Sequence, residues 1–244
     1  MLNKEGIRMK IVLNYEGNKI EGEIIYLEKK NISIEITSRG TFIVRSSKRF
    51  KKERILELLE GKKDWILEKV LYIKEKNNLV ITREFKSGEI FYYLADKYIL
   101  EVICDKKLKS YLDFDNRKIV VGVDNYDKEL IKKQIELLYK KEAKIYISSR
   151  VEYYKEILGV QYKSITIKSA KRRLGSCTYD DKLLFNWKIM MANRDIVDYL
   201  VVHEMSHIIF KNHSKDFWNK VREILPDYKE RRQWLKENGF KLEL

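Results

Sequence analysis

Hydrophobic and polar residues alternate with a period of two along the first 45 positions of the chain. The alternation is clearest at 32–36 and 42–44, and turn residues such as Gly17-Asn18 and Arg39-Gly40 separate the runs. A period of two places successive side chains on opposite faces of a strand. We therefore predict a β-meander over this segment.

The spacing of apolar residues becomes helical between residues 51 and 76, with an interruption near Gly61. Short runs of alternating and β-branched residues return between residues 89 and 123. The four strands predicted there are Ile90–Leu94, Tyr98–Ile103, Tyr111–Phe114 and Ile119–Val123. Residues 1–125 are thus predicted to form an N-terminal, mostly-β accessory unit that also carries helices.

Helices dominate the prediction for residues 126–244. Asp124 or Asn125 is expected to cap a long helix that Gly159 ends, and strands are expected at Ser164–Ser169 and Lys182–Trp187. The expected N-caps of the last three helices are Asn193, Ser214 and Asp227. The prediction for the whole chain is an α+β fold, with a domain boundary near residue 125.

Composition excludes several classes of protein. Hydrophobic residues make up 44% of the 244, enough for a core, and 10 glycines with a single proline exclude a low-complexity chain. No apolar run reaches the roughly 18 residues of a membrane span, and the N-terminus lacks the apolar segment of a signal peptide. Two cysteines, Cys104 and Cys177, cannot form a disulfide framework. We therefore expect a cytoplasmic protein without a membrane partner.

The chain carries a formal net charge of +14, from 51 basic and 37 acidic residues. The excess is spread over both halves, although Lys48–Lys52 and Lys171–Arg173 form local basic clusters. Binding to nucleic acid is one interpretation of such an excess. A general compositional bias towards lysine is the other, because dispersed charge is a weak signature of binding.

All three histidines lie within eleven residues, in the segment HEMSHIIFKNH that begins at His203. His203 and His207 are four residues apart on a predicted helix, so both imidazoles project from the same face. This HExxH spacing allows both rings to bind one zinc ion, and Glu204 is placed to act as general base on a water molecule. We predict a catalytic zinc site with these three residues.

The third protein ligand is predicted to be His213, because the helix must end near Phe210–Asn212 and a turn can return the chain to the metal. Two alternatives stay open. A glutamate on a later helix could serve instead, or Cys177 could complete a structural zinc site with four ligands. The glutamate candidates are Glu223, Glu230 and Glu237. A metzincin is improbable, because Phe210 replaces its glycine and no methionine follows His213.

The segments around the motif resemble the YgjP-like metallopeptidase family, a relative of the SprT-like proteases. Val201–His207, Asn212-His213-Ser214 and Pro226-Asp227-Tyr228 match its C-terminal part. Arg172–Thr178 and Phe185-Asn186-Trp187 match its T-R-W-G-S-C-S and L-N-W segments, with Leu174 in place of the tryptophan. The resemblance implies a zincin-like metallopeptidase domain over residues 126–244, one zinc ion on His203, His207 and His213, and Glu204 as the base.

Four further residues are candidates for lining the site. Arg173 and Tyr199 could stabilise the negative charge that develops during hydrolysis. Cys177 lies beside the metal in one interpretation and is an ordinary packed residue in the other, and Asn186 belongs to the family-like segment. Strand 182–187 could offer an edge to an extended peptide, or could lie inside a hairpin. Trp218 and Trp234 are expected to be core aromatics.

Two hypotheses for function follow. The first is a zinc-dependent metallopeptidase that hydrolyses peptide or protein substrates with Glu204 as general base. The second is a nucleic-acid-binding protein whose metal helix is structural or vestigial. The two combine in a protease recruited to DNA–protein complexes, which the basic clusters and the SprT-like resemblance both allow.

Overall fold

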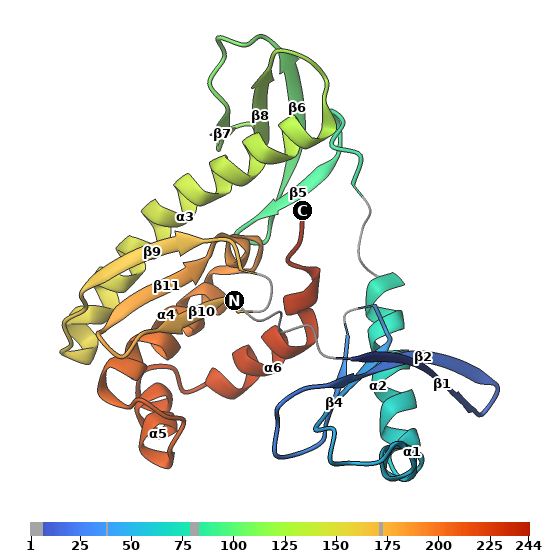
Figure 1. The fold of residues 1–244 in the computed structure, drawn as a ribbon. Coiled ribbons are helices and arrows are strands. Elements are labelled where there is room, and N and C mark those ends of the chain that lie inside the picture. The colour runs from blue at the N-terminus through green and yellow to red at the C-terminus, as the bar shows by residue number, and fades with distance from the viewer. Residues whose placement is uncertain (1–6, 38, 79–82, 171–172) are drawn as a thin grey trace, which may run out of the picture. The chain divides into compact units, whose positions relative to one another are not determined.

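The structure is a computed structural model that describes residues 7–37, 39–78, 83–170 and 173–244. It divides into two compact units, Met1–Ile81 and Thr82–Leu244, which are described separately below. Mixed sheets and six α-helices make up the described fold (Figure 1), so the α+β prediction is confirmed. The division falls well before residue 125, where the sequence placed the domain boundary.

The first unit contains a four-stranded sheet in the order β1-β2-β4-β3. Its strands are β1 (Arg8–Tyr15), β2 (Asn18–Tyr26), β3 (Ser33–Ile36) and β4 (Phe42–Ser46). The predicted strands are present, but the predicted meander is wrong, because β4 lies between β2 and β3 and pairs parallel with β2. A tight turn at Glu16 and Gly17, both with positive φ, joins β1 to β2.

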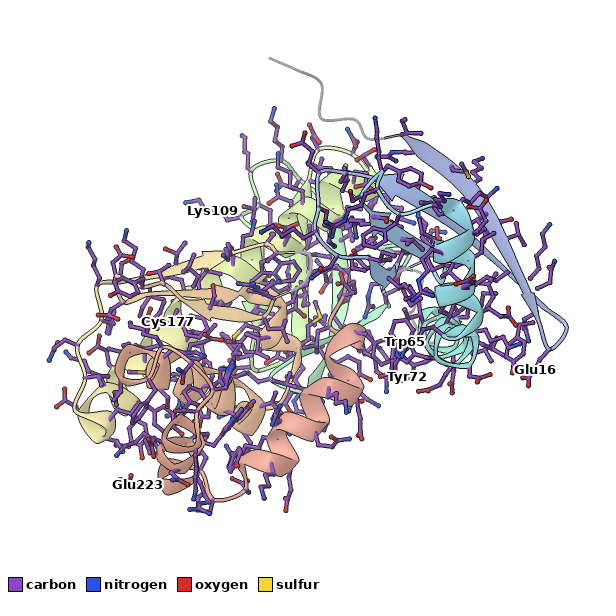
Figure 2. All side chains as sticks on the ribbon, turned by 60° about the horizontal axis from the view of Figure 1, so that its bottom comes forward. Glu16, Trp65, Tyr72, Lys109, Cys177 and Glu223 are labelled. Atoms are coloured by element: carbon purple, nitrogen blue, oxygen red, sulfur yellow. The ribbon has the colours of Figure 1, made fainter. Side chains whose placement is uncertain are left out.

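Helices α1 (Lys52–Glu60) and α2 (Lys63–Asn78) pack their apolar side chains against this sheet. Gly61 ends α1, as the sequence predicted. Ile24, Val44 and Ile66 are fully buried in the shared core, whereas Trp65 remains 39% exposed on α2 (Figure 2). The first unit therefore has a hydrophobic core of its own.

The second unit begins with another four-stranded sheet, in the order β5-β6-β8-β7. Its strands are β5 (Ile90–Tyr93), β6 (Asp96–Cys104), β7 (Tyr111–Asp113) and β8 (Lys118–Val123). Helix α3 (Lys128–Leu158) follows directly, and Asp127 caps it by accepting the Leu130 N–H at 2.7 Å. Asp124 and Asn125, the caps predicted from sequence, lie before the helix begins. Gly159, with φ +64°, ends α3 as predicted.

We call residues 164–241 of the second unit the metal-motif region. It combines a three-stranded sheet with three α-helices. The sheet has the order β10-β11-β9, formed by β9 (Ser164–Lys168), β10 (Gly175–Cys177) and β11 (Lys182–Asn186). The short helix η1 (Trp187–Met191) leads into α4 (Arg194–Ile209), α5 (Lys215–Ile224), α6 (Tyr228–Asn238) and η2 (Gly239–Lys241). The hypothesis that residues 182–187 form a free edge is wrong, because β11 is paired on both sides and the edge strands are β10 and β9.

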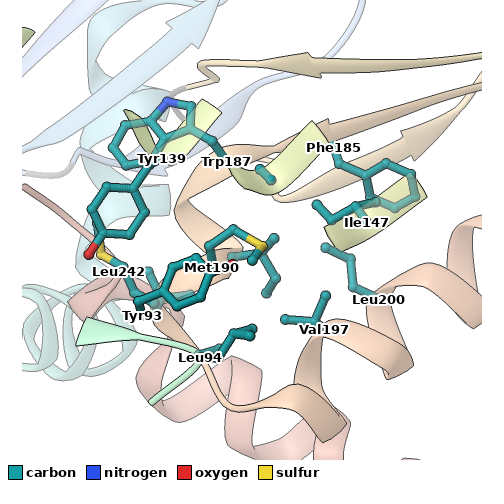
Figure 3. Packing of buried hydrophobic residues seen from close by; sticks show 14 of the residues in the cluster. Tyr93, Leu94, Tyr139, Ile147, Phe185, Trp187, Met190, Val197, Leu200 and Leu242 are labelled. Atoms are coloured by element: carbon teal, nitrogen blue, oxygen red, sulfur yellow. The ribbon is translucent and has the colours of Figure 1, made fainter. Parts of the chain in front are cut away.

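One continuous hydrophobic core holds the second unit together (Figure 3). Tyr93 of β5, Tyr139 of α3 and Trp187 of η1 lie in the same cluster as Val197 and Leu200 of α4. The Tyr139 hydroxyl also donates to the Tyr92 carbonyl at 2.5 Å. Strands 90–123 therefore belong with the metal-motif region, which is why the compact units divide before them rather than after residue 125.

No helix of the described chain combines the length and the hydropathy required of a membrane span. Asn193 and Ser214 cap α4 and α5 as predicted, with side chains that accept the backbone N–H of Ile196 at 3.0 Å and of Phe217 at 3.3 Å. Asp227 precedes α6 but makes no side-chain cap, because its carboxylate accepts from Arg231 at 2.8 Å. The caps at Asn193 and Ser214 set where α4 and α5 begin.

Candidate metal centre

Helix α4 presents His203 and His207 one turn apart on one face. The opposite side of the helix is fixed in the core by Val201, Val202 and Met205, which are all fully buried. An ion pair reinforces this anchoring, because Arg150 of α3 binds the Asp198 carboxylate through two nitrogens, at 2.6 and 2.8 Å. The two imidazoles therefore project from a rigid scaffold.

The chain leaves the helix at Phe210 and returns His213 to the other two histidines. His213 Nε2 lies 3.1 Å from His203 Nε2 and 3.2 Å from His207 Nε2. Among the described residues, these three are the one group whose His, Cys, Asp or Glu ligand atoms could jointly hold a metal ion. The turn predicted after the helix thus brings the third histidine to the first two.

The chemistry of this donor set fits a metal cation. His207 Nδ1 lies 2.9 Å from the Phe210 carbonyl, so the ring donates there and its Nε2 keeps a free lone pair. A single proton on His213 Nε2 can be donated to only one of the two neighbouring atoms, His203 Nε2 or His207 Nε2. The lone pair of the other nitrogen then has no proton to accept within the group. Three nitrogens bound to zinc at about 2.0–2.1 Å in tetrahedral directions lie about 3.3 Å apart, close to the spacing observed.

The His203 and His213 rings favour the neutral form that binds metals. Burial lowers the pKa of His203 to about 3, and His207, His213 and Arg232 add to this effect through their charge. Burial, followed by His207 and Arg232, also lowers the pKa of His213. The Nδ1 atom of His203 is buried without a hydrogen-bond partner among the described residues.

Two aromatic residues at the start of α5 support the three imidazoles. Phe217 is fully buried, and its ring centroid lies 4.5 to 5.0 Å from each of the three histidine rings. Trp218 stacks on His213 at 5.5 Å, with 18° between the planes. The expectation that Trp218 is only a core residue is therefore incomplete, because it also orients a candidate ligand.

The Glu204 carboxylate projects from α4 towards the edge strand β10. It is only 5% exposed, and it accepts the backbone N–H of Cys177. A Cβ atom at Gly175 would lie 2.5 Å from Glu204 Oε1, so only glycine leaves room for the carboxylate. Burial raises the pKa of Glu204 to about 8, against the opposing effects of the Cys177 N–H and the positive charge of Arg173.

The other predicted site residues occupy different positions around this carboxylate. Tyr199 packs its ring 5.8 Å from that of His203, and burial raises the pKa of its hydroxyl to about 12. Burial raises the pKa of the Cys177 thiol to about 11, and its Sγ lies 3.4 Å from the Thr178 carbonyl. Arg173 is exposed. Cys177 is thus a neutral thiol, and the roles predicted for Arg173, Cys177 and Tyr199 stay predictions.

Asn186 supports the loop before β10 and uses all its polar atoms on backbone groups. Its amide donates to the carbonyls of Ala170 at 2.8 Å and Arg173 at 3.2 Å, and its Oδ1 accepts the Lys188 N–H at 3.2 Å.

Within the described chain, the glutamates proposed as alternative ligands do not join the metal group, and Glu223 on α5 instead pairs with Lys220 at 2.7 Å (Figure 2).

Sequence reasoning missed three residues that contribute to this arrangement. Gly175 was visible only as part of a family-like segment, and Phe217 follows the third histidine by one helical turn without any polar atom to attract attention. Arg232 reaches the site from α6, with its Cζ 4.6 Å from the Trp218 ring centroid. Nothing in its local sequence distinguishes it from Arg231 beside it.

The chain belongs to the YgjP-like metallopeptidase domain family, which it matches over residues 30–238. The predicted family resemblance is therefore confirmed, and membership supports metallopeptidase activity. A metal ion, usually zinc, is implied by the same family. No curated protein matched the chain.

Two solved structures that are similar to part of the chain are archaeal. The metallopeptidase zymogen abylysin from Pyrococcus abyssi shares 22% identity, with 37% of this chain and 93% of that chain covered and a TM-score of 0.34. The metallopeptidase zymogen jannalysin from Methanocaldococcus jannaschii shares 21% identity, with 37% and 94% covered and a TM-score of 0.34. Similarity of this degree gives no basis for transferring details to this chain.

Proposed function

We propose that the protein is a zinc-dependent metallopeptidase with one zinc ion held by His203, His207 and His213. The observation that supports this most directly is the convergence of the three Nε2 atoms beside the buried carboxylate of Glu204. Three histidine ligands leave a fourth coordination position open, as catalytic zinc sites require. A zinc ion bound there would supply a Lewis acid for the scissile carbonyl and lower the pKa of a bound water molecule.

Glu204 is the general base of this proposal. Its carboxylate accepts a proton from the attacking water and returns it to the nitrogen of the leaving amine. Gly175 and the Cys177 N–H hold the carboxylate in one position for both transfers. Arg173 and Tyr199 are the two candidates for stabilising the negative charge that develops on the substrate oxygen.

The free edge of β10 suggests how an extended substrate is held. The Asn186 N–H donates to the Leu174 carbonyl at 2.7 Å, and the Thr178 N–H donates to Lys182 at 2.9 Å. Because hydrogen-bonded and non-hydrogen-bonded pairs alternate in an antiparallel ladder, the polar backbone groups of Gly175 and Cys177 point away from β11. Since Glu204 binds the Cys177 N–H, a substrate strand would pair with the N–H and carbonyl of Gly175 and with the Cys177 carbonyl. A substrate strand can add at this edge, next to Glu204.

The metal content of the purified protein tests the ligand set. We expect about one zinc per chain in the wild type and in Glu204→Gln, and a large loss in His213→Ala, because two imidazoles alone bind zinc far more weakly than three. Elemental analysis after dialysis against a weak chelator measures this. Lys215→Ala, two residues from His213 and exposed, is the control that should keep its zinc.

Retention of stoichiometric zinc in His213→Ala would contradict the proposed ligand set. An absence of metal from wild-type protein purified in zinc-supplemented medium would contradict the metallopeptidase proposal as a whole. These two results are distinguishable, because only the second affects the wild type.

A second candidate function, binding of nucleic acid, is favoured by two adjoining loops of the first unit. We call Lys29-Lys30 and Lys48–Lys52 the basic loops; the Arg49 guanidinium joins them by donating to the Lys30 carbonyl. Among the described residues, Lys30, Lys48, Lys51 and Lys52 form no ion pair. Other cations of this unit, such as Arg45 and Lys63, pair with glutamates. Of the other basic cluster, Lys171 and Arg172 lie outside the described residues.

Binding to a 30-base-pair DNA duplex, followed by mobility shift at several salt concentrations, tests this candidate. If the basic loops contact the phosphates, replacing Lys48, Lys51 and Lys52 with glutamine should weaken binding and reduce the slope of log K against log salt by about two to three. Replacing Arg54, Lys63 and Lys69, which are already paired, provides a charge-matched control. The absence of any shift at low salt would contradict DNA binding.

A further inference from the structure

A cation that has no anionic partner among the described residues lies beside the metal centre. Arg232 of α6 is exposed, and it forms neither an ion pair nor a hydrogen bond with any other described residue. Its neighbour Arg231 has an evident structural role, because it binds the Asp227 carboxylate at 2.8 Å and the Asp195 carbonyl at 2.9 Å. The structure therefore accounts for Arg231 and leaves the guanidinium of Arg232 available to a ligand.

Stacked rings hold this guanidinium near the three histidines. Arg232 Cζ lies 4.6 Å from the centre of the Trp218 ring, and Trp218 stacks on His213 at 5.5 Å. Tyr228, one turn before Arg232 on α6, also stacks on Trp218, at 5.4 Å and 19°. The cation–π contact fixes the guanidinium, and the two distances together place it within about 10 Å of the His213 ring.

A peptide bound at the metal centre would bring its own groups within reach of this cation. An extended chain advances about 3.3–3.6 Å per residue, so 10 Å corresponds to about three residues. The planar guanidinium can donate two parallel hydrogen bonds to a carboxylate, which makes this the group it recognises best on a peptide. The apolar face of Trp218 shields one side of the pair from water, which strengthens it.

We propose that Arg232 and Trp218 form a subsite that selects peptides carrying a carboxylate within about three residues of the scissile bond. The carboxylate is that of an acidic side chain or of the peptide's own carboxyl terminus. This inference rests on the proposed peptidase function, because it assumes that the substrate lies at the three histidines. It assigns Arg232 to substrate binding and leaves the reaction itself to Glu204.

Peptide binding to zinc-loaded Glu204→Gln protein, which should not turn substrate over, tests the subsite by calorimetric titration. Three pentapeptide probes are compared: one with a central aspartate and both ends capped, its asparagine counterpart, and an uncharged peptide with a free carboxyl terminus. We expect at least about tenfold tighter binding of one carboxylate probe over the asparagine probe. The probe that binds tighter identifies the source of the carboxylate.

The added substitution Arg232→Gln should reduce this ratio towards one, whereas Lys229→Gln, which removes a charge from an exposed position on the same helix, should leave it intact. Equal weakening of all three probes by Arg232→Gln, or no preference before the substitution, would overturn the proposal. The titration is repeated on metal-free protein, where the preference should persist because its residues belong to the chain. If the protein proves unable to bind zinc but still prefers the carboxylate probe, the preference supports the subsite, and the missing zinc contradicts only the metallopeptidase proposal.

Discussion

Replacing Glu204 with glutamine is expected to lower kcat/KM for peptide hydrolysis by at least about a hundredfold, the usual contribution of a general base. Glutamine has nearly the same shape, so it fits the space that Gly175 leaves open. Its amide oxygen can still accept the Cys177 N–H. The substitution therefore removes proton transfer while preserving the packing, and the zinc content should stay at the wild-type value. Steady-state kinetics on a quenched fluorescent peptide library, with parallel metal analysis, measures both.

The matched control is Glu230→Gln, which makes the same chemical change at an exposed position on α6 and should leave kcat/KM unchanged. Full hydrolytic activity in Glu204→Gln protein that holds one zinc per chain would refute the role of Glu204. A loss of zinc together with activity would instead show that the carboxylate supports the metal centre. Measuring both quantities keeps these cases apart.

The local arrangement of the metal centre could be predicted because helix geometry is local. A separation of four residues places His203 and His207 on one face, whatever the rest of the fold does. His213 follows from the cap at Ser214, since a helix that ends near Phe210 and another that begins at Lys215 leave only a short turn between them. Spacing and capping were therefore sufficient to expect the three imidazoles to meet.

The order of strands could not be predicted in the same way. Alternation identifies a strand and its two faces, but it carries no information about which strand lies beside it. The parallel pairing of β2 with β4, and the central position of β11, both depend on tertiary packing of apolar faces. The division into compact units depends on tertiary packing too, because the shared core of β5 and α4 joins residues far apart in sequence.

The residues around the three histidines were missed because their roles depend on neighbours from other elements. Phe217 and Trp218 have ordinary core character in sequence, and only the return of the chain after α4 brings their rings against the imidazoles. Arg232 approaches the site from a third helix. The residues of a metal-binding motif can thus be identified from one segment of the sequence, whereas the residues that support them come from several segments.

Gly175→Ala is expected to lower kcat by about a hundredfold without loss of zinc, because displacing a reacting group by about 1 Å can have an effect of this size. The added methyl would lie 2.5 Å from Glu204 Oε1, 2.7 Å from Cγ and 2.9 Å from Cδ, all well inside van der Waals contact. The φ of Gly175 lies outside the left-handed region, so alanine introduces no backbone strain. Since Glu204 is buried, its carboxylate must move away from its position over β10.

A double-mutant cycle shows whether this loss acts through Glu204. If Gly175→Ala works by displacing the carboxylate, adding it to Glu204→Gln should cause little further loss, because the base is already absent. Gly239→Ala is the control, since its added methyl would meet nothing closer than Leu174 Cδ1 at 3.9 Å. Losses that multiply in the double variant would show that Gly175 acts independently of Glu204, through the substrate edge of β10 instead.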